Sequence, residues 1–153
     1  MSADSDWRVE EIQVGYCRSM VPLARRARNQ HQSHQAATFC LAADYTGGIA
    51  LYTLLRGLPT FGVHPAEGGW GLNLWLLKSD LKFLKPSTSD LTISARLKPE
   101  RYGRITRRFF KGDRVIESVA VVMENGGEVV CTGSMTYFIQ LMDYRRWLEL
   151  NTP

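Results

Sequence analysis

The first residue that could do chemistry is Asp44, which lies inside a long apolar segment. Residues 36–55 (AATFCLAADYTGGIALYTLL) contain this one carboxylate and no basic side chain. On a helix, Asp44 shares a stripe with small or apolar neighbours such as Cys40 and Leu51, which cannot neutralise it. A buried carboxylate must be paired, protonated or in chemical use. Two interpretations stay open: a carboxylate tied by hydrogen bonds to a neighbouring strand or subunit, and an acid with raised proton affinity at the wall of a cleft.

The segment around Asp44 predicts a buried helix rather than a membrane span. Twenty residues are long enough to cross a bilayer, but a carboxylate at that depth costs about 3 kcal/mol. Ser33 is a suitable N-cap, and Gly57 followed by Pro59 is a typical helix end. We therefore expect a long central helix that is buried on nearly all sides and needs a sheet to cover it.

Strand patterns supply that cover. Residues 90–98 alternate apolar and polar side chains, and residues 70–84 are strand-like, so these two segments predict a hairpin with its turn at 85–89. The valine-rich segments 114–124 and 128–141 flank Asn-Gly-Gly and predict a second hairpin.

A further strand is expected within residues 9–23, where apolar side chains recur at every second position. The order is therefore one strand, a long helix and about four antiparallel strands. An antiparallel sheet wrapped around one buried central helix is an α+β hotdog fold.

Composition bounds the remaining possibilities. The chain has 153 residues, of which 44% are hydrophobic and 22% charged, and this predicts one domain over 1–153 with its core at about 9–141. Disordered, collagen-like and coiled-coil classes are excluded. Three widely spaced cysteines suit neither a disulfide framework nor a metal site, and the acidic N-terminus is no signal peptide, so we expect a cytoplasmic protein without a bound metal.

Two motifs resemble the hotdog-fold acyl thioesterases of the phenylacetate-pathway and 4-hydroxybenzoyl-CoA type. Asn29 precedes Asp44 by 15 residues, which is the family's usual interval between its polar amide and its carboxylate. Residues 78–86 (KSDLKFLKP) are similar to the family's strand that ends in Phe-Leu-Lys/Arg-Pro. One departure is clear, because Gln35-Ala36-Ala37 stands where the family often has His-Gly-Gly. The resemblance extends over about residues 9–140.

The resemblance implies a hydrolase that cleaves an acyl-CoA or acyl-carrier-protein thioester. Asp44 would act as general base or nucleophile, and Asn29 would hold the water or the carbonyl. The backbone N–H groups of Ala36 and Ala37 would polarise the carbonyl at the helix N-terminus. Substrate contacts are expected from Gln35, Gly48, Arg101, Arg104, Arg107 and Arg108.

The resemblance also implies a homodimer or tetramer with the site between subunits, and no cofactor beyond the CoA or phosphopantetheine of the substrate. Two alternatives stay open: a related hotdog dehydratase or hydratase, which would normally pair a histidine with the acid, and a non-catalytic acyl-binding or assembly module. The arginines belong to residues 96–114, which contain eight basic and two acidic side chains and predict a short helix over 99–111. They form either a solvated face or a site for an anionic partner; interleaved aromatics are too few for nucleic acid.

Several other residues have a structural interpretation. We expect His31 and His34 to face solvent in a loop, because a zinc site would need more ligands than the sequence offers. Gly47 and Gly48 suit close packing against a strand or a partner helix. Trp70 and Trp75 are expected in the core or in a subunit contact.

Overall fold

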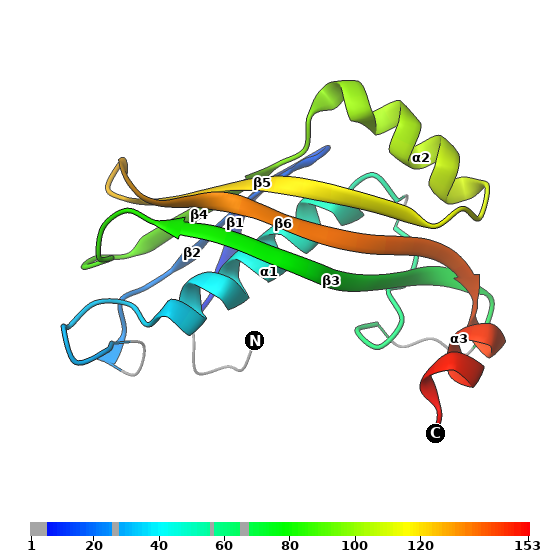
Figure 1. Cartoon of the computed structure of the whole chain (residues 1–153), viewed down its shortest axis with the longest axis horizontal. Coiled ribbons are helices and arrows are strands. Elements are labelled where there is room, and N and C mark those ends of the chain that lie inside the picture. The colour runs from blue at the N-terminus through cyan, green and yellow to red at the C-terminus, as the bar shows by residue number, and fades with distance from the viewer. Residues whose placement is uncertain (1–5, 26–27, 56, 65–67) are drawn as a thin grey trace.

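The computed structural model describes residues 6–25, 28–55, 57–64 and 68–153 of the chain. It is an α+β structure with one antiparallel six-stranded sheet in the order β1-β2-β4-β5-β6-β3 (Figure 1). The strands are β1 (Arg8–Gln13), β2 (Tyr16–Val21), β3 (Trp70–Phe83), β4 (Leu91–Arg96), β5 (Val115–Asn125) and β6 (Glu128–Asp143). The helices are α1 (Ala36–Tyr52), the short η3 (Pro99–Arg101), α2 (Tyr102–Phe110) and α3 (Tyr144–Asn151). The start of the acidic N-terminal segment lies outside the described residues.

Helix α1 crosses the inner face of the sheet, as Figure 1 shows. Its buried side meets the inner residues of the strands, among them Ile93, Val119 and Met135, in one hydrophobic core. The predicted helix is shorter than expected, with 17 residues, because the chain leaves helical geometry after Tyr52 in a series of turns. The expectation of burial on nearly all sides is wrong, because one sheet covers one side of a helix and Leu41 stays 48% exposed.

The pairing of β3 also differs from the expected hairpin. β3 pairs along its whole length with β6, from Trp70 opposite Asp143 to Phe83 opposite Cys131, and not with β4. β4 lies instead between β2 and β5. In the described sheet β3 is therefore an edge strand, and its other edge is bridged at Leu72 by Thr60 but has no strand beside it.

The remaining strand predictions are confirmed with one correction. β5 and β6 form the predicted hairpin around Asn125-Gly126-Gly127. The single strand expected in residues 9–23 is two strands, because Val14 and Gly15 reverse the chain between β1 and β2. Gly15 has φ +70°, and Tyr102 occupies the space that a Cβ would need there.

Helix α2 confirms the helix predicted in the basic segment. Its residues Ile105 and Phe109 are fully buried in the core, and the helix contacts β5 and β6. Lys111 and Gly112 follow its last turn, where Gly112 takes a positive φ of +89°. Within the described residues, no helix is both long and apolar enough to span a membrane.

Candidate active site

The N-terminus of α1 is open. Gln35 is the N-cap residue, and its side chain makes no capping hydrogen bond; its Nε2 donates instead to the carbonyl of Arg28 at 3.2 Å. The predicted N-cap Ser33 is wrong, since its hydroxyl bonds to Asn29. The N–H groups of Ala36 and Ala37 belong to the first turn, where a helix offers no internal acceptor. Both residues are exposed, so this end presents donors and a positive dipole to any ligand.

A pocket of about 390 Å³ opens beside this helix end. Ala36 and Phe39 of α1 form one side, and Phe83 of β3 faces them, with the two phenyl rings edge to face at 5.2 Å between centroids. The remaining lining residues are Asn29, His31, Ser33, His34, Leu84, Lys85, Pro86 and Ser87. The pocket therefore combines an aromatic wall with polar groups and the open end of α1.

Asn29 organises the loop that leads into the helix. Its Oδ1 accepts hydrogen bonds from the backbone of His31 at 2.9 Å and from the backbone and hydroxyl of Ser33 at 3.2 and 3.1 Å. Its Nδ2 makes a longer contact of 3.5 Å with the His34 carbonyl. The amide oxygen is thus engaged inside the loop, and Nδ2 is the part of Asn29 that a substrate could recruit.

His34 is buried, so the expectation of a solvent-facing histidine is wrong for this residue, whereas His31 is exposed. Its Nε2 lies 3.2 Å from the carbonyl of Pro22 and its Nδ1 lies 2.7 Å from the Ser87 hydroxyl. A carbonyl only accepts, so Nε2 carries the proton and Nδ1 accepts from Ser87. Burial lowers the pKa of His34, which favours this neutral form. His34 therefore ties the helix entry loop to the segment before β4.

Asp44 lies two turns further along α1, half-buried and facing the Tyr137 side chain of β6. Burial raises the pKa of the Asp44 carboxyl, and a hydrogen bond from Tyr137 opposes that rise. No salt bridge among the described residues involves Asp44. Asp44 does not line the pocket, and eight residues of helical rise, about 12 Å, separate it from Ala36.

The Gly47-Gly48 pair makes room for Tyr137. A Cβ on Gly47 would lie 2.5 Å from the Tyr137 hydroxyl, and one on Gly48 would lie in ordinary contact at 3.8 Å. The predicted close packing of the two glycines against a strand is confirmed. The predicted contact of Gly48 with a substrate remains a prediction.

The four arginines expected at the substrate divide into two pairs. Arg101 forms an ion pair of 2.9 Å with the buried Glu117 of β5, and Arg108 contacts Asp113 and the carbonyl of Arg114. Arg104 and Arg107 are exposed on the outer side of α2. The first pair therefore supports the fold, and the second is available to an anion.

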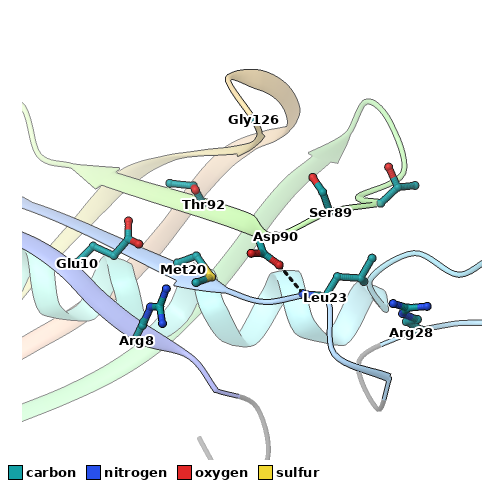
Figure 2. Close-up of a pocket in the computed structure, with 10 residues that line it drawn as sticks. Arg8, Glu10, Met20, Leu23, Arg28, Ser89, Asp90, Thr92 and Gly126 are labelled. Atoms are coloured by element: carbon teal, nitrogen blue, oxygen red, sulfur yellow. Dashed lines mark hydrogen bonds between the residues drawn. The ribbon is translucent and has the colours of Figure 1, made fainter.

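A second pocket, of about 710 Å³, is lined by residues of β1, β2 and β4 and by Arg28 (Figure 2). Arg8 and Glu10 of β1 approach it from one side, and Asp90, which precedes β4, and Thr92 of β4 from the other, with Met20 between them. Asp90 is occupied in accepting a hydrogen bond from the Leu23 backbone. This pocket carries mixed charges and contains none of the residues that the sequence predicted for the site.

The sequence missed three features of the site. Phe83 lies within the Phe-Leu-Lys-Pro motif that carried the resemblance, so the motif could have assigned it to the pocket. Phe39 occupies the buried side of α1 one turn into the helix and was readable from helical spacing. Tyr137, 93 positions after Asp44 in the chain, had no local signal, because its contact with Asp44 depends on how the sheet wraps the helix.

The same fold occurs in solved structures whose names include thioesterases. A Pseudomonas aeruginosa protein of unknown function, described as a probable thioesterase, has a TM-score of 0.67 at 22% identity, covering 91% of this chain and 85% of that one. A hypothetical thioesterase protein with coenzyme A from Streptococcus pneumoniae has a TM-score of 0.62 at 17% identity, covering 88% and 86%. A Haemophilus influenzae thioesterase has 0.62 at 12%, covering 87% and 77%.

No family model and no curated protein sequence matches the chain. At these identities the structural likeness establishes the fold. The fold that the resemblance implies is therefore confirmed, and the thioesterase activity stays a prediction. Trp70 and Trp75 were expected in the core or in a subunit contact; at 58% and 52% exposure they do not lie in the core of the chain.

Proposed function

We propose that the protein is a thioesterase that hydrolyses an acyl thioester of CoA or of an acyl carrier protein. One observation carries this proposal: the uncapped N-terminus of α1 opens on an apolar pocket, and a carboxylate without a cationic partner among the described residues lies on the same helix. The fold shared with proteins named thioesterases, one of them with coenzyme A, agrees with it.

The chemistry follows from those groups. The thioester carbonyl binds against the N–H groups of Ala36 and Ala37, where the helix dipole stabilises the negative charge that develops on its oxygen. Asp44, in ionised form, takes a proton from the attacking water or attacks the carbonyl carbon itself. In the first route the thiolate of CoA or phosphopantetheine leaves with the proton that Asp44 took from the water. In the second route the thiolate leaves an acyl anhydride on Asp44, and a water then hydrolyses this anhydride to the free acid, restores the carboxylate and supplies the proton for the thiol.

The single chain separates these groups, and the surface of β3 suggests how they meet. Trp75, Leu77 and Phe83 of this edge strand are each at least half exposed, at 52%, 54% and 50%. Leu41 and Tyr45 on the uncovered side of α1 are also exposed, at 48% and 42%. An apolar strand edge beside an uncovered helix side is typical of an interface rather than of a solvated surface.

A second copy paired along β3 would complete the site. Asp44 lies level with the middle of β3, because its partner Tyr137 pairs with Leu76, whereas the pocket lies at Phe83 near the end of the strand. Antiparallel pairing of two β3 strands about a two-fold axis between these levels brings Asp44 of one subunit level with the pocket of the other. We therefore propose a homodimer with two shared sites.

The exposed arginines of α2 suit the anionic part of the substrate. Arg104 and Arg107 are not engaged by any acid among the described residues. We propose that they attract the phosphates of CoA or the acidic surface of a carrier protein, which would place the reaction in the cytoplasm, where both occur.

Release of free thiol from a panel of acyl-CoA and acyl-carrier-protein substrates tests the proposed activity. Wild-type protein should release thiol from at least one of them, and folded Asp44→Ala protein should not. Hydration or dehydration without thiol release would favour the hydratase alternative. Binding of acyl-CoA without any turnover would favour an acyl-binding module.

Subunit complementation tests the shared site. Asp44→Ala removes the carboxylate, and Ala36→Trp fills the pocket, so each homodimer should be inactive. In an equal mixture that reassorts freely, half of the dimers are mixed and each of these has one intact site, so about a quarter of wild-type activity should return. A mixture as inactive as its parents, with mixed dimers verified by mass spectrometry, would show that each chain contains its own site.

A further inference from the structure

We propose that Tyr137 is a positioning residue for Asp44, and that its single hydroxyl proton moves between two acceptors on that residue, the backbone carbonyl and the carboxylate. This inference rests on the proposed role of Asp44 as the base or nucleophile. It assigns to the site a strand residue that neither sequence motif contains.

The contact between the two residues is built into the fold. Tyr137 is fully buried on the inner face of β6, and its hydroxyl donates to the Asp44 carbonyl at 2.6 Å. The hydroxyl lies over Gly47, where any Cβ would approach it to 2.5 Å. Because a side chain at position 47 would displace the ring, this glycine serves the position of the phenol.

The hydroxyl has a second acceptor within reach. Hydrogen bonding from Tyr137 lowers the pKa of the Asp44 carboxyl, against the larger upward effect of burial. Burial and the nearby Asp44 charge raise the pKa of Tyr137 far above its ordinary value, so the phenol keeps its proton throughout the working range. A phenol with one permanent proton can serve one acceptor at a time.

The other charged side chains described around this contact are paired or point away from Asp44, so Tyr137 is the group that acts on its carboxyl. Glu117 of β5 pairs with Tyr137 across the sheet but is held by Arg101. The charged residues of β3 in this region, Lys78 and Asp80, pair with Thr136 and Ser134 and so point to the opposite face. Three neighbouring side chains are not among the causes of the Asp44 shift: Cys40, Tyr45 and Cys131.

The two acceptors define two states of the site. When Asp44 is ionised, the Tyr137 hydroxyl donates its hydrogen bond to the carboxylate. This bond replaces part of the hydration that the carboxylate lost on burial, and it fixes the orientation of the carboxylate. When the carboxylate takes a proton from water, the phenol proton returns to the carbonyl, so no group is left unsatisfied. Tyr137 therefore keeps Asp44 ionised at a pH where burial alone would protonate it.

Tyr137→Phe tests this inference, with Tyr45→Phe as the matched control. Tyr45 is the neighbour of Asp44 on α1, but its ring contacts Trp7, so loss of its hydroxyl should change nothing at Asp44. The Asp44 carboxyl is followed by ¹³C NMR titration, with its signal assigned by its absence in Asp44→Asn. In Tyr137→Phe the Asp44 titration, and with it the acidic limb of kcat/KM, should move to higher pH, while the rate above that limb is retained.

A purely structural Tyr137 would leave the titration of Asp44 unchanged in folded Tyr137→Phe protein, and that result overturns the inference. Should Tyr137→Phe fail to fold, 3-fluorotyrosine at position 137 keeps the ring and is a stronger donor, so it should move the Asp44 titration to lower pH; an unmoved titration again overturns the inference. The NMR readout needs no turnover. A shifted titration in a protein that never releases thiol supports the contact and rejects the proposed function.

Discussion

Two carboxylates lie beside Tyr137, and they differ in whether a cation pairs with them. Glu117 reaches the tyrosine from β5, is 4% exposed in its side chain, and has the Arg101 guanidinium at 2.9 Å. Asp44 meets it from α1, is half-buried, and has the Tyr137 hydroxyl as its hydrogen-bond donor instead of a cation. A paired acid is a fixed part of the structure, whereas an acid that is desolvated without a counter-ion keeps a raised proton affinity. The difference supports the proposal that Asp44 is the acid that acts in the reaction.

The largest expected effect comes from removing the available acid. Asp44→Ala should lower kcat by about 10²- to 10³-fold, because it removes the proposed base or nucleophile, with a much smaller change in KM. Steady-state thiol release measures it, with circular dichroism to verify the fold. Full turnover in Asp44→Ala would show that Asp44, like Glu117, is not needed for the reaction.

Neutralising the paired acid should affect stability instead. Glu117→Gln replaces a charge-assisted hydrogen bond by a neutral one and should lower the free energy of unfolding by about 1–2 kcal/mol, with kcat nearly unchanged. Urea denaturation measures the loss. Glu124→Gln, on the same strand and in no ion pair among the described residues, is the matched control and should be close to neutral. A catalytic defect in Glu117→Gln without a stability loss would contradict the assignment.

The contrast between a paired and an unpaired charge also applies to the arginines of the basic segment, where Arg104 and Arg107 are exposed and in no ion pair among the described residues. The double variant Arg104→Glu/Arg107→Glu should raise KM severalfold at low ionic strength, and the difference from wild type should shrink in high salt as the charges are screened. Kinetics at two salt concentrations measure it. A KM that does not respond to the reversal would show that the outer side of α2 is a solvated face.

The smallest expected effect is the change in melting temperature when Asp44 is replaced by asparagine. Its pKa is raised in the folded state, so folding favours the protonated form, and the stability that this form contributes is lost as pH rises through the folded pKa. Asp44→Asn should therefore raise the melting temperature slightly at neutral pH and lose that advantage below the unfolded pKa of about 3.9. Thermal melts across this range give the sign. A destabilised Asp44→Asn protein at neutral pH would mean that the partners of the carboxylate stabilise its charge by more than burial disfavours it.

The sequence predicted local elements well, because each depends on a pattern within a few residues. The β5–β6 hairpin followed from Asn125-Gly126-Gly127, and β4 from strict alternation. The partner of β3 did not follow, since strand pairing is decided by the whole sheet rather than by the turn at 85–89. The exposed side of α1 was also hidden, because the sequence of an apolar helix does not show whether the chain covers one side of it or every side.

The candidate site also has features that the sequence predicted and features that it did not. The helix N-terminus at Ala36 and the isolated acid at Asp44 were visible in the sequence, because one depends on a helix start and the other on composition. The contacts of His34 with Ser87, and of Asp44 with Tyr137, join residues 53 and 93 positions apart. The engagement of Arg101 by Glu117 was hidden for the same reason, since charge counting does not tell a paired arginine from a free one.

The pairing of β3 with β6 has a consequence for synthesis of the chain. β3 ends at Phe83, and its partner strand begins 45 positions later and finishes only at Asp143. On the ribosome, fourteen largely apolar residues therefore have no strand on either side until nearly the whole chain has emerged. A truncated chain released at Asn125, before β6, should bind the chaperones that recognise extended apolar segments, and one released at Asn151 should not.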